Sequence, residues 1–411
     1  MPGPGRAVSG GPGHPGGVPA RQEGGLVLLL GALVAFGPLS IDLYLPALPA
    51  IARGLDATME AVQLTITVFL AGFSLGMLFY GPLSDRYGRR RVLLGGIGLF
   101  VLASLACTLA QAVEQLLLAR FLQALGGGAA SVLARAVVRD VYAETEAIRK
   151  LSLMAMVTAV APLLAPLLGS VLLDLCGWRG TFAALLAWGG LSLLVVGYRL
   201  PETLPASRRG GLSLGSAFAA YGRLLRDPLA LGLLLAGGMS FAAMFAYITG
   251  GPFYFIALHR FSPLAFSLVF AGNAIGIFCA NFLNSRLVRS RGPRAMVGAG
   301  SLLGFAGALA LAAGSAAEHL PTVVAGLFVV VSMTGLLGAN CVGLLMTRYP
   351  QNSGAAAALF GASQFGLGML ASAAVSYLHD PAGGSMARVI LAVSTLSVAG
   401  CLLFRRMDTR S

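Results

Sequence analysis

The stretch GPLSDRYGRRRVLL, residues 81–94, places one acid and four arginines in a short turn between two long apolar segments. Gly81 and Gly88 permit tight backbone geometry at either end of the acidic part. A loop that only keeps positive charge on one side of a membrane would explain the arginines. It would not explain Asp85 or the spacing of the glycines, so this turn needs a further explanation.

The rest of the chain has the composition of an integral membrane protein. Of its 411 residues, 57% are hydrophobic and only 10% are charged, whereas about a quarter of the residues in soluble globular proteins are charged. The net charge of +13 arises from short basic clusters between apolar runs rather than from one basic patch. We therefore expect the chain to lie in a lipid bilayer and to have no nucleic-acid partner.

The apolar runs are long enough to be membrane spans, because a helix needs about 20 residues to cross a hydrocarbon core about 30 Å thick. Twelve such segments occur, at residues 26–48, 61–83, 92–112, 115–138, 150–174, 178–199, 228–256, 264–286, 294–315, 320–346, 353–377 and 386–405. The sequence therefore predicts an all-α membrane protein with twelve transmembrane helices.

The longest polar break, residues 200–227, divides these segments into two groups of six. It predicts two six-helix bundles, 26–199 and 228–405, joined by a cytoplasmic linker. Apolar residues recur within the linker at helical spacing, which indicates an interfacial helix. They are Leu214, Phe218, Tyr221 and Leu225.

Lysine and arginine are concentrated in alternate loops, on the side that also holds the two ends of the chain. Cytoplasmic loops near span ends carry such an excess. We therefore predict cytoplasmic tails at 1–25 and 406–411 in a multi-pass membrane protein. Residues 1–25 are rich in Gly and Pro and are expected to be disordered.

A second turn echoes the first, because NSRLVRSRGPRAMV (284–297) follows the eighth span as the first turn follows the second span. The two turns align at two pairs of residues, Gly88 with Gly292 and Arg90 with Arg294. Such a match implies duplication of a six-span unit. The second copy has Arg289 where the first has Asp85, so it lacks the acid, and we expect any latch that depends on this acid to be weak or absent there.

The first turn resembles, at every defining position, the signature G-x-L-S/A-D-R-x-G-R-R between spans two and three of the major facilitator superfamily. The resemblance implies the fold of that superfamily and a gating role for Gly81, Asp85, Arg86, Gly88, Arg89 and Arg90. We expect Asp85 to lie near the start of the eleventh span, whose unpaired N–H groups carry a partial positive charge. This contact would hold the two halves together while the transport site faces outward.

Span four reads ARFLQALGGGAASVLARAVVRD (119–140) and contains a basic residue, Arg120, within the membrane. It is similar to the R-x-x-Q-G-x-G motif of the superfamily, which implies a role in proton transfer, although Ala124 replaces the first glycine. Arg120 could instead extend its charged end to the membrane surface.

Span five contains VAPLLAPLLGSVL (160–172), in which Pro162, Pro166 and Gly169 recur on nearly one helical face. On physical grounds this is a kinked, closely packed helix. It resembles a variant of the span-five signature of proton-coupled exporters. Together with SIDLYLPALPAI in span one and RAVVRDVY at the end of span four, it is similar to drug exporters of the Bcr/CflA type. This resemblance implies a location in a bacterial cytoplasmic (inner) membrane.

Span one contains GPLSIDLYLPALP (37–49), with a carboxylate, Asp42, where a membrane helix is expected. An ionised group near the middle of a bilayer costs roughly 3 kcal/mol on insertion scales. We expect Asp42 to carry the proton and Arg120 to couple to it, although a carboxylate at a helix end stays an alternative. Residues that could line an amphiphilic substrate pocket are Tyr44, Gln123, Tyr247, Phe253, Tyr254, Asn273, Asn340 and Gln364.

The sequence lacks the residues that ATP binding and metal binding by cysteines require. The only lysine, Lys150, has no glycine-rich loop before it, and the five cysteines are isolated from one another, so neither an ATP site nor a cysteine metal site is expected. We predict no enzyme activity, no cofactor and no metal.

We predict a monomeric, proton-coupled antiporter that exports small amphiphilic drugs by alternating access, with the drug and protons as its ligands. Two alternatives stay open. One is a proton-coupled importer or exporter of a sugar or other metabolite on the same fold, and the other is a membrane sensor that does not transport.

Overall fold

The computed structural model describes residues 20–209, 214–378, 380 and 382–408, in which α-helices are labelled α and short 3-10 or π-helical segments η. In chain order the elements are α1 (Ala20–Val34), α2 (Phe36–Asp42), η1 (Leu45–Ala47), α3 (Leu48–Gly54), α4 (Met59–Tyr87), α5 (Arg89–Leu109), α6 (Val113–Val141), α7 (Glu144–Arg199), η2 (Ala206–Arg208), α8 (Leu214–Arg226), α9 (Pro228–Gly251), η3 (Pro252–Leu258), α10 (Pro263–Arg291), α11 (Pro293–Ala316), α12 (Leu320–Arg348), η4 (Pro350–Asn352), α13 (Ser353–Tyr377) and α14 (Gly384–Asp408).

The predicted membrane spans all lie on helical segments. Ten helices in the described ranges are long and apolar enough to cross a membrane. A further span consists of two helical segments, Gly25–Val34 and Phe36–Gly54, which are bent by 44° relative to each other. The apolar part of α7, Arg149–Arg199, has 51 residues and would be about 76 Å long as one helix. It is broken at Gly177, whose φ of 68° is not helical, and so contains the predicted fifth and sixth spans. The fold is therefore the predicted one of twelve transmembrane helices.

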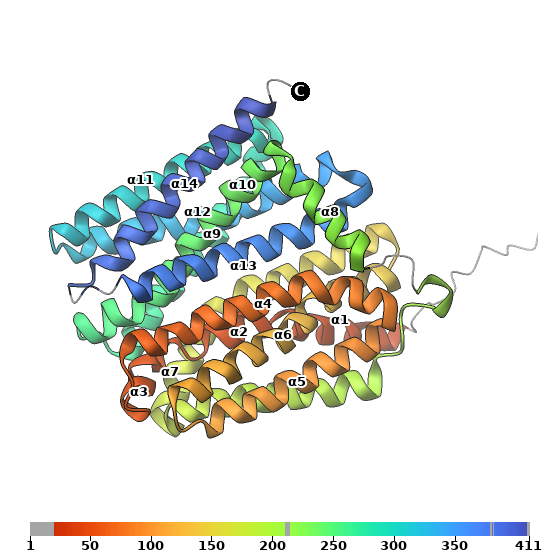
Figure 1. Ribbon diagram of the computed structural model, residues 1–411, viewed down its shortest axis with the longest axis horizontal. Helices are drawn as coiled ribbons and strands as arrows, with labels where there is room; N and C mark the ends of the chain where they lie inside the picture. The colour runs from red at the N-terminus through yellow and green to blue at the C-terminus, as the bar shows by residue number, and fades with distance from the viewer. Residues whose placement is uncertain (1–19, 210–213, 379, 381, 409–411) are drawn as a thin grey trace, which may run out of the picture.

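The helices form two groups that correspond to the predicted halves, as Figure 1 shows. In the first half α4 and α5 pack on α6, and in the second half α13 and α14 pack on α9 while α11 packs on α12. The halves meet mainly along two helix pairs, α4 with α13 and α7 with α10. The end of the bundle that holds α3 is called the far end below, and the end that holds the linker is called the linker end.

The two basic turns have the same backbone conformation. Gly88 (φ 95°, ψ 147°) separates α4 from α5, and Gly292 (φ 78°, ψ 155°) separates α10 from α11. A positive φ of this kind favours glycine, because a Cβ atom would introduce strain. The predicted alignment of Gly88 with Gly292 is thereby confirmed.

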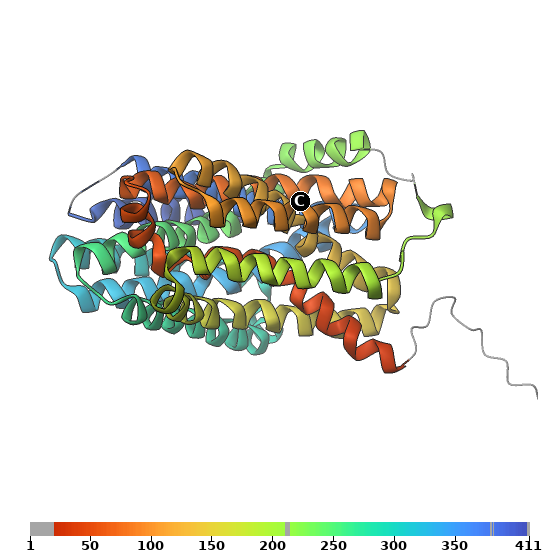
Figure 2. The ribbon, with the colours of Figure 1, turned by 90° about the horizontal axis from the view of Figure 1, so that it is seen from below.

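The linker contains a helix, α8, over the residues predicted to be helical, and it lies along the outside of the bundle (Figure 2). Tyr221 is buried, whereas Phe218 and Leu225 are exposed. Tyr221 Oη donates a hydrogen bond to Leu78 O of α4 at 3.4 Å, and the Phe218 and Phe79 rings lie 5.2 Å apart. Because α8 also contacts α9 and α13, it touches both halves of the molecule.

The ends of the chain differ in extent from the predicted tails. The first helix begins at Ala20, inside the segment 1–25 that was expected to be disordered. Residues 20–23 are Ala, Arg, Gln and Glu, which favour helix and extend it beyond the apolar segment. At the other end α14 continues to Asp408, beyond position 405. Residues 1–19 and 409–411 lie outside the described residues.

Candidate functional site

Asp42 lies at a break in span one. It is the last residue of α2, and a 3-10 segment, η1, follows before the chain resumes as α3. Pro46 and Pro49 lack the N–H groups that a continuous helix would use, which explains the interruption. The Asp42 side chain is only 4% exposed. Interrupted spans of this kind commonly form the binding sites of transporters.

Span five packs directly against this break. Gly169 of α7 lies so close to the carbonyl oxygen of Leu43, the residue after Asp42, that a Cβ atom there would collide with it. Pro166 accepts a hydrogen bond at 3.0 Å from Ser267 of α10, in the other half. Pro162 is half-buried. Two of the three predicted span-five residues therefore make close contacts, Gly169 with the break in span one and Pro166 with the second half.

Arg120 is fully buried inside the first half and does not extend to the membrane surface. Its guanidinium carbon lies 4.3 Å from the centroid of the Tyr44 ring, 4.2 Å from Phe69 and 5.8 Å from Phe182. Aromatic faces attract a cation electrostatically. Arg120 Nη1 donates to Gln123 Oε1 at 2.5 Å, whereas Arg120 Nε and Nη2 have no hydrogen-bond partner within the described ranges.

A short hydrogen-bond chain fixes this arginine. Gln123 Nε2 donates to Ser104 Oγ at 2.8 Å, and Ser104 Oγ donates to Phe100 O at 2.7 Å. Tyr44 Oη and Thr65 Oγ1 share a hydrogen bond of 3.1 Å. The structure therefore places the predicted residues Tyr44 and Gln123 around Arg120. Both are fully buried, at 0% exposure.

The second half contributes Tyr247 and Asn273 near Asp42. The Tyr247 side chain is 1% exposed and stacks on Phe270, with ring centroids 5.7 Å apart. Tyr247 interacts electrostatically with Asp42 and lies close to Asn273. Among the described residues no hydrogen bond of normal geometry joins Tyr247 to Asn273, and Tyr247 Oη and Asn273 Nδ2 are both buried without a partner. We call Asp42, Tyr247 and Asn273, three buried polar residues of the two halves, the polar cluster; α10, which carries Asn273, contacts η1 shortly after Asp42.

The remaining predicted pocket residues lie apart from this cluster. Asn340 Nδ2 donates to Asn284 Oδ1 at 2.8 Å, which joins α12 to α10. Tyr254 is buried on η3 beside His259, with ring centroids 4.5 Å apart. Phe253 on η3 and Gln364 on α13 are half-buried.

One polar group between the halves was not predicted. Ser372 Oγ of α13 shares hydrogen bonds of 2.7 Å with Thr67 Oγ1 of α4 and 2.8 Å with Thr249 Oγ1 of α9. Single hydroxyls are frequent in membrane helices and often join helices. Their positions in the sequence therefore gave no signal that these three would meet.

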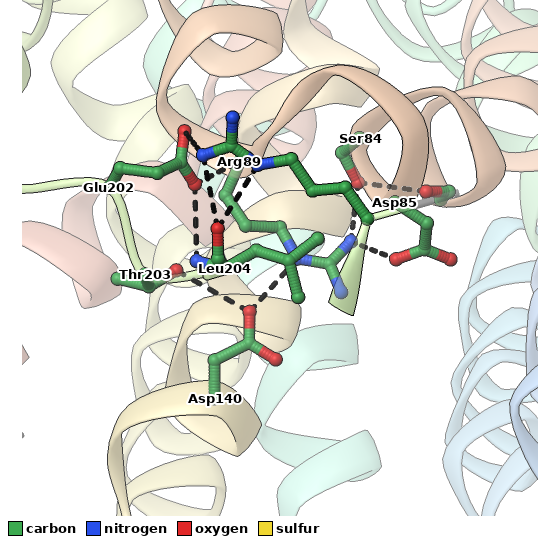
Figure 3. A network of polar contacts seen from close by, with 9 residues as sticks. Ser84, Asp85, Arg89, Asp140, Glu202, Thr203 and Leu204 are labelled. Carbon is green, nitrogen blue, oxygen red and sulfur yellow. Dashed lines mark hydrogen bonds and ion pairs between the residues drawn. The ribbon is translucent and has the colours of Figure 1, made fainter. Parts of the chain in front are cut away.

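At the linker end, Arg89 is the centre of the predicted gating turn, as Figure 3 shows. Arg89 Nη1 lies 2.6 Å from Asp85 Oδ1, and Arg89 Nε lies 2.9 Å from Asp140 Oδ2. Arg89 Nη1 also donates to Ser84 Oγ at 2.5 Å. Asp140 ends α6, so the guanidinium ties the ends of spans two and four together.

Glu202 from the start of the linker completes this network (Figure 3). Its Oε1 accepts a hydrogen bond from the backbone N–H of Arg89 at 2.8 Å, at the unpaired N-terminus of α5. Its Oε2 lies 3.6 Å from Arg209 Nη2. Neither Asp140 nor Glu202 was singled out from the sequence, although both are carboxylates at span ends near a basic turn.

The other residues of the gating turn have varied surroundings. Arg90 Nη2 donates to Gly197 O at 2.6 Å, Arg86 is exposed, and no atom lies within 4 Å of a Cβ placed on Gly81. In the described part of the chain no hydrogen bond joins Asp85 to the first residues of α13. The charge of Asp85 acts instead on Tyr221 of α8, whose pKa is raised by burial and by this charge.

The described chain thus has the architecture of a helical membrane transporter, with two repeated bundles, an interrupted first span and a polar cluster between the halves. The chain belongs to the Major Facilitator Superfamily, whose family model matches residues 28–373. Proteins of this family are transporters, and the chain is not an enzyme.

Several relatives and solved structures resemble it. The uncharacterized MFS-type transporter YdgK of Bacillus subtilis is 36% identical over 86% of this chain and 88% of its own length. A bicyclomycin resistance protein homolog of Haemophilus influenzae is 28% identical over 90% of this chain and 94% of its own length. The multidrug resistance protein MdtL of Escherichia coli is 39% identical over 43% of this chain and 45% of its own. A D-xylose-proton symporter has a TM-score of 0.71, at 18% identity over 92% and 95% of the two chains, which supports the fold alone.

Proposed function

We propose that this protein exports small amphiphilic drugs across a bacterial cytoplasmic membrane in exchange for protons, by alternating access. The observation that carries the proposal is the position of Asp42. This carboxyl group is buried at a break in span one, interacts electrostatically with Tyr247 of the other half and belongs to the half that holds Arg120. Acidic and basic residues inside a membrane commonly mark ion and proton pathways.

The direction of transport is supported by relatives and by span five. Two relatives carry names that refer to resistance to drugs. The exporter-like residue Gly169 packs on the backbone next to Asp42, and Pro166 contacts the second half. Movement of span five would therefore act on the proposed proton site and on the contact between the halves at once.

In the proposed cycle Asp42 carries a proton in one state and is ionised in the other. Arg120 has two unpaired groups, Nε and Nη2, that could donate to an ionised carboxylate when the helices rearrange. Tyr247 and Asn273, with their unpaired groups, would bind the drug beside Asp42. Because the drug and the proton would use the same cluster, one would displace the other.

Alternation between two sides requires contacts that break in turn. At the far end α3 and η1 contact η3 of the other half. We propose that these contacts separate in the outward-facing state and that Asp85 then reaches the N-terminus of α13, whose dipole favours an acid. With both termini in the cytoplasm, the linker end would be the cytoplasmic end.

The test is a panel of amphiphilic antibiotics, including bicyclomycin, in an efflux-deficient bacterial host that expresses the chain. Wild type should raise resistance to at least one compound, and a protonophore should remove the effect. Asp42→Asn should lower the resistance to the level of the empty vector, because the side chain can no longer carry a proton.

The matched control is Asp174→Asn, an exposed acid on α7, which should behave as wild type. Full resistance with Asp42→Asn would contradict the role of Asp42. Resistance that persists with the protonophore would contradict proton coupling, and a wild type inactive on the whole panel would contradict drug export.

A further inference from the structure

Three hydroxyl groups meet between the halves, toward the far end of the bundle. Ser372 Oγ of α13 lies between Thr67 Oγ1 of α4, at 2.7 Å, and Thr249 Oγ1 of α9, at 2.8 Å. The bond to Thr67 joins the two halves, whereas the bond to Thr249 lies within the second half. Ser372 and Thr249 are fully buried, and Thr67 is half-buried. These three residues are called the hydroxyl triad below.

From the triad to the middle of the membrane, α4 and α13 are held together as an antiparallel pair. The Phe73 and Phe365 rings lie 4.6 Å apart, and Ser74 Oγ donates a hydrogen bond to Ala362 O at 2.8 Å. Residue numbers thus rise along α4 as those of their partners fall along α13. On the linker side of Ser74 no hydrogen bond joins the described residues of these two helices. The hydrogen bonds of this pair therefore extend from its centre toward the far end.

The linker end of the same helix pair is where we proposed that Asp85 reaches α13 in the outward-facing state. In the described chain that contact is not made, whereas the bond between Thr67 and Ser372 is. Both helices are continuous, α4 over Met59–Tyr87 and α13 over Ser353–Tyr377. A tilt that brings their linker ends together would therefore separate their far ends.

The bond between Thr67 and Ser372 can break without leaving a buried group unpaired. A hydroxyl group has one hydrogen and two acceptor lone pairs, so Ser372 can bond both threonines and can keep Thr249 when Thr67 moves away. Thr67 is half-buried, so its hydroxyl can bond to water after separation. Because an unpaired buried polar group costs more than an exchanged hydrogen bond, this arrangement keeps the separation reversible.

The second helix pair that joins the halves, α7 with α10, has a hydroxyl group with the same arrangement. Ser267 Oγ lies 3.0 Å from Pro166 O in the first half and 2.8 Å from Pro263 O in its own helix. Ser267 is fully buried and lies in the first turns of α10, at the far end. Each pair thus holds a buried serine with one partner across the interface and one in its own half.

We infer that the hydroxyl triad is a latch that holds the far end closed, and that Ser372 switches between two partners and one. It bonds Thr67 and Thr249 while the far end is closed, and Thr249 alone once the halves separate there. The latch rests on the proposed alternating access, but not on the identity of the substrate or on proton coupling.

The two threonines should then affect the far end in opposite directions. Thr67→Val removes a hydrogen bond that only the closed state makes, and so favours opening. Thr249→Val removes the partner that Ser372 needs after separation, and so favours closure. A general loss of packing would instead act in the same direction in both variants.

The experiment is hydrogen–deuterium exchange with mass spectrometry on the full-length protein in lipid nanodiscs. Thr67→Val should raise the exchange rate at the far end about fivefold, as expected for one neutral hydrogen bond, and should not raise it at the linker end. Thr249→Val should lower the far-end rate by up to about fivefold. The far-end peptides are 48–58 and 252–262, and the linker-end peptides are 81–91 and 349–357.

The matched control is Ser376→Ala. Ser376 is buried one turn after Ser372 on α13, but its Oγ donates to Ser372 O of the same helix, at 3.1 Å. This bond does not depend on how the halves lie, so the variant should leave the exchange at both ends as in wild type.

A far-end rate that Thr67→Val leaves unchanged, or that Thr249→Val does not lower, would overturn the inference. A rise at both ends with Thr67→Val would overturn it as well, because the variant would then only loosen the fold. These readouts do not use transport, so they stand if the antibiotic panel disproves drug export.

Discussion

The two halves of the molecule share a backbone plan but differ in their charges. Gly88 and Gly292 adopt the same left-handed conformation at equivalent turns. In the first half the spans contain Asp42 and Arg120, both buried. In the second half α9 and α13 contain no acidic or basic residue, and α12 has only Arg348 at its end.

This difference separates two requirements of a transporter. A rocking motion about a central site needs two similar bundles, and the repeated turns provide them. Charge inside a membrane is costly, and one buried acid with one buried cation is enough to couple movement to a proton. We infer that the duplicated backbone serves the motion, while the chemistry is kept in one copy.

The largest expected effect comes from Arg120→Lys. An ammonium group cannot stack on Tyr44 and Phe69 as the planar guanidinium does, nor keep the same bond to Gln123. Proton-coupled transport in proteoliposomes should fall about 10- to 100-fold, since a hydrogen bond to a charged group is worth about 1.5–3 kcal/mol. The melting temperature in detergent is the control for folding. Wild-type transport by the lysine variant would refute the role of this geometry.

A second comparison uses the two basic turns. Asp85→Asn removes the acid that pairs with Arg89, and should slow transport about tenfold while drug binding stays near normal. In the second turn Arg289 occupies the position of Asp85, and Pro293 occupies the position of Arg89, so no ion pair can form there. Arg289→Gln should therefore change the transport rate less than about twofold. Equal effects in the two turns would contradict the proposed asymmetry.

The glycines of the two turns should differ in their effect on stability. A Cβ atom at Gly292 would lie in open space, so Gly292→Ala should lower the free energy of unfolding by about 1 kcal/mol, from the positive φ alone. Gly88→Ala should cost about 2 kcal/mol, because the methyl group also displaces the Glu202 carboxylate from the Arg89 N–H. Thermal unfolding of both variants measures the difference. A larger loss for Gly292→Ala would show that Glu202 contributes nothing at this turn.

The smallest expected effects concern the two tyrosines that attach the linker to the halves. Tyr221 of the linker contacts α4 in the first half. Tyr349 of the second half donates a hydrogen bond through Oη to Asp227, the last residue of the linker. Burial and this hydrogen bond raise the pKa of Tyr349 to about 12. Because the pKa is higher in the folded state, the hydroxyl contributes a constant amount to the free energy of unfolding below about pH 10, the pKa of tyrosine in the unfolded chain. This contribution is lost as the pH rises through about 12.

Tyr349→Phe should therefore lower stability by about 1 kcal/mol or less, equally at pH 6 and pH 9. Tyr221→Phe should cost less, because its bond to Leu78 O is long, at 3.4 Å. Unfolding curves at the two pH values test both statements. A loss for Tyr349→Phe that changes between pH 6 and pH 9 would contradict the assignment of the pKa.

Much of the fold could be predicted, because membrane spans depend on local composition. Apolar length located all the spans, and the turn at 81–94 was sufficient to suggest the family. The broken first span was less visible, although Pro46 and Pro49 follow Asp42 directly. The candidate site was predicted in part: Asp42, Arg120 and Gly169 were identified, and so were Tyr44 and Gln123, which contact Arg120. The aromatic residues Phe69 and Phe182 around the same arginine were not predicted.

The sequence by itself determined the number of spans, their division into two halves and the presence of an acid and a base within the membrane, because hydrophobicity, length and charge are local properties. Only the tertiary structure decided which side chains meet. It placed Phe69 and Phe182 around Arg120, Tyr247 where it interacts electrostatically with Asp42, and Glu202 at the predicted gating turn. These contacts join residues distant in the chain, so they depend on how the helices pack.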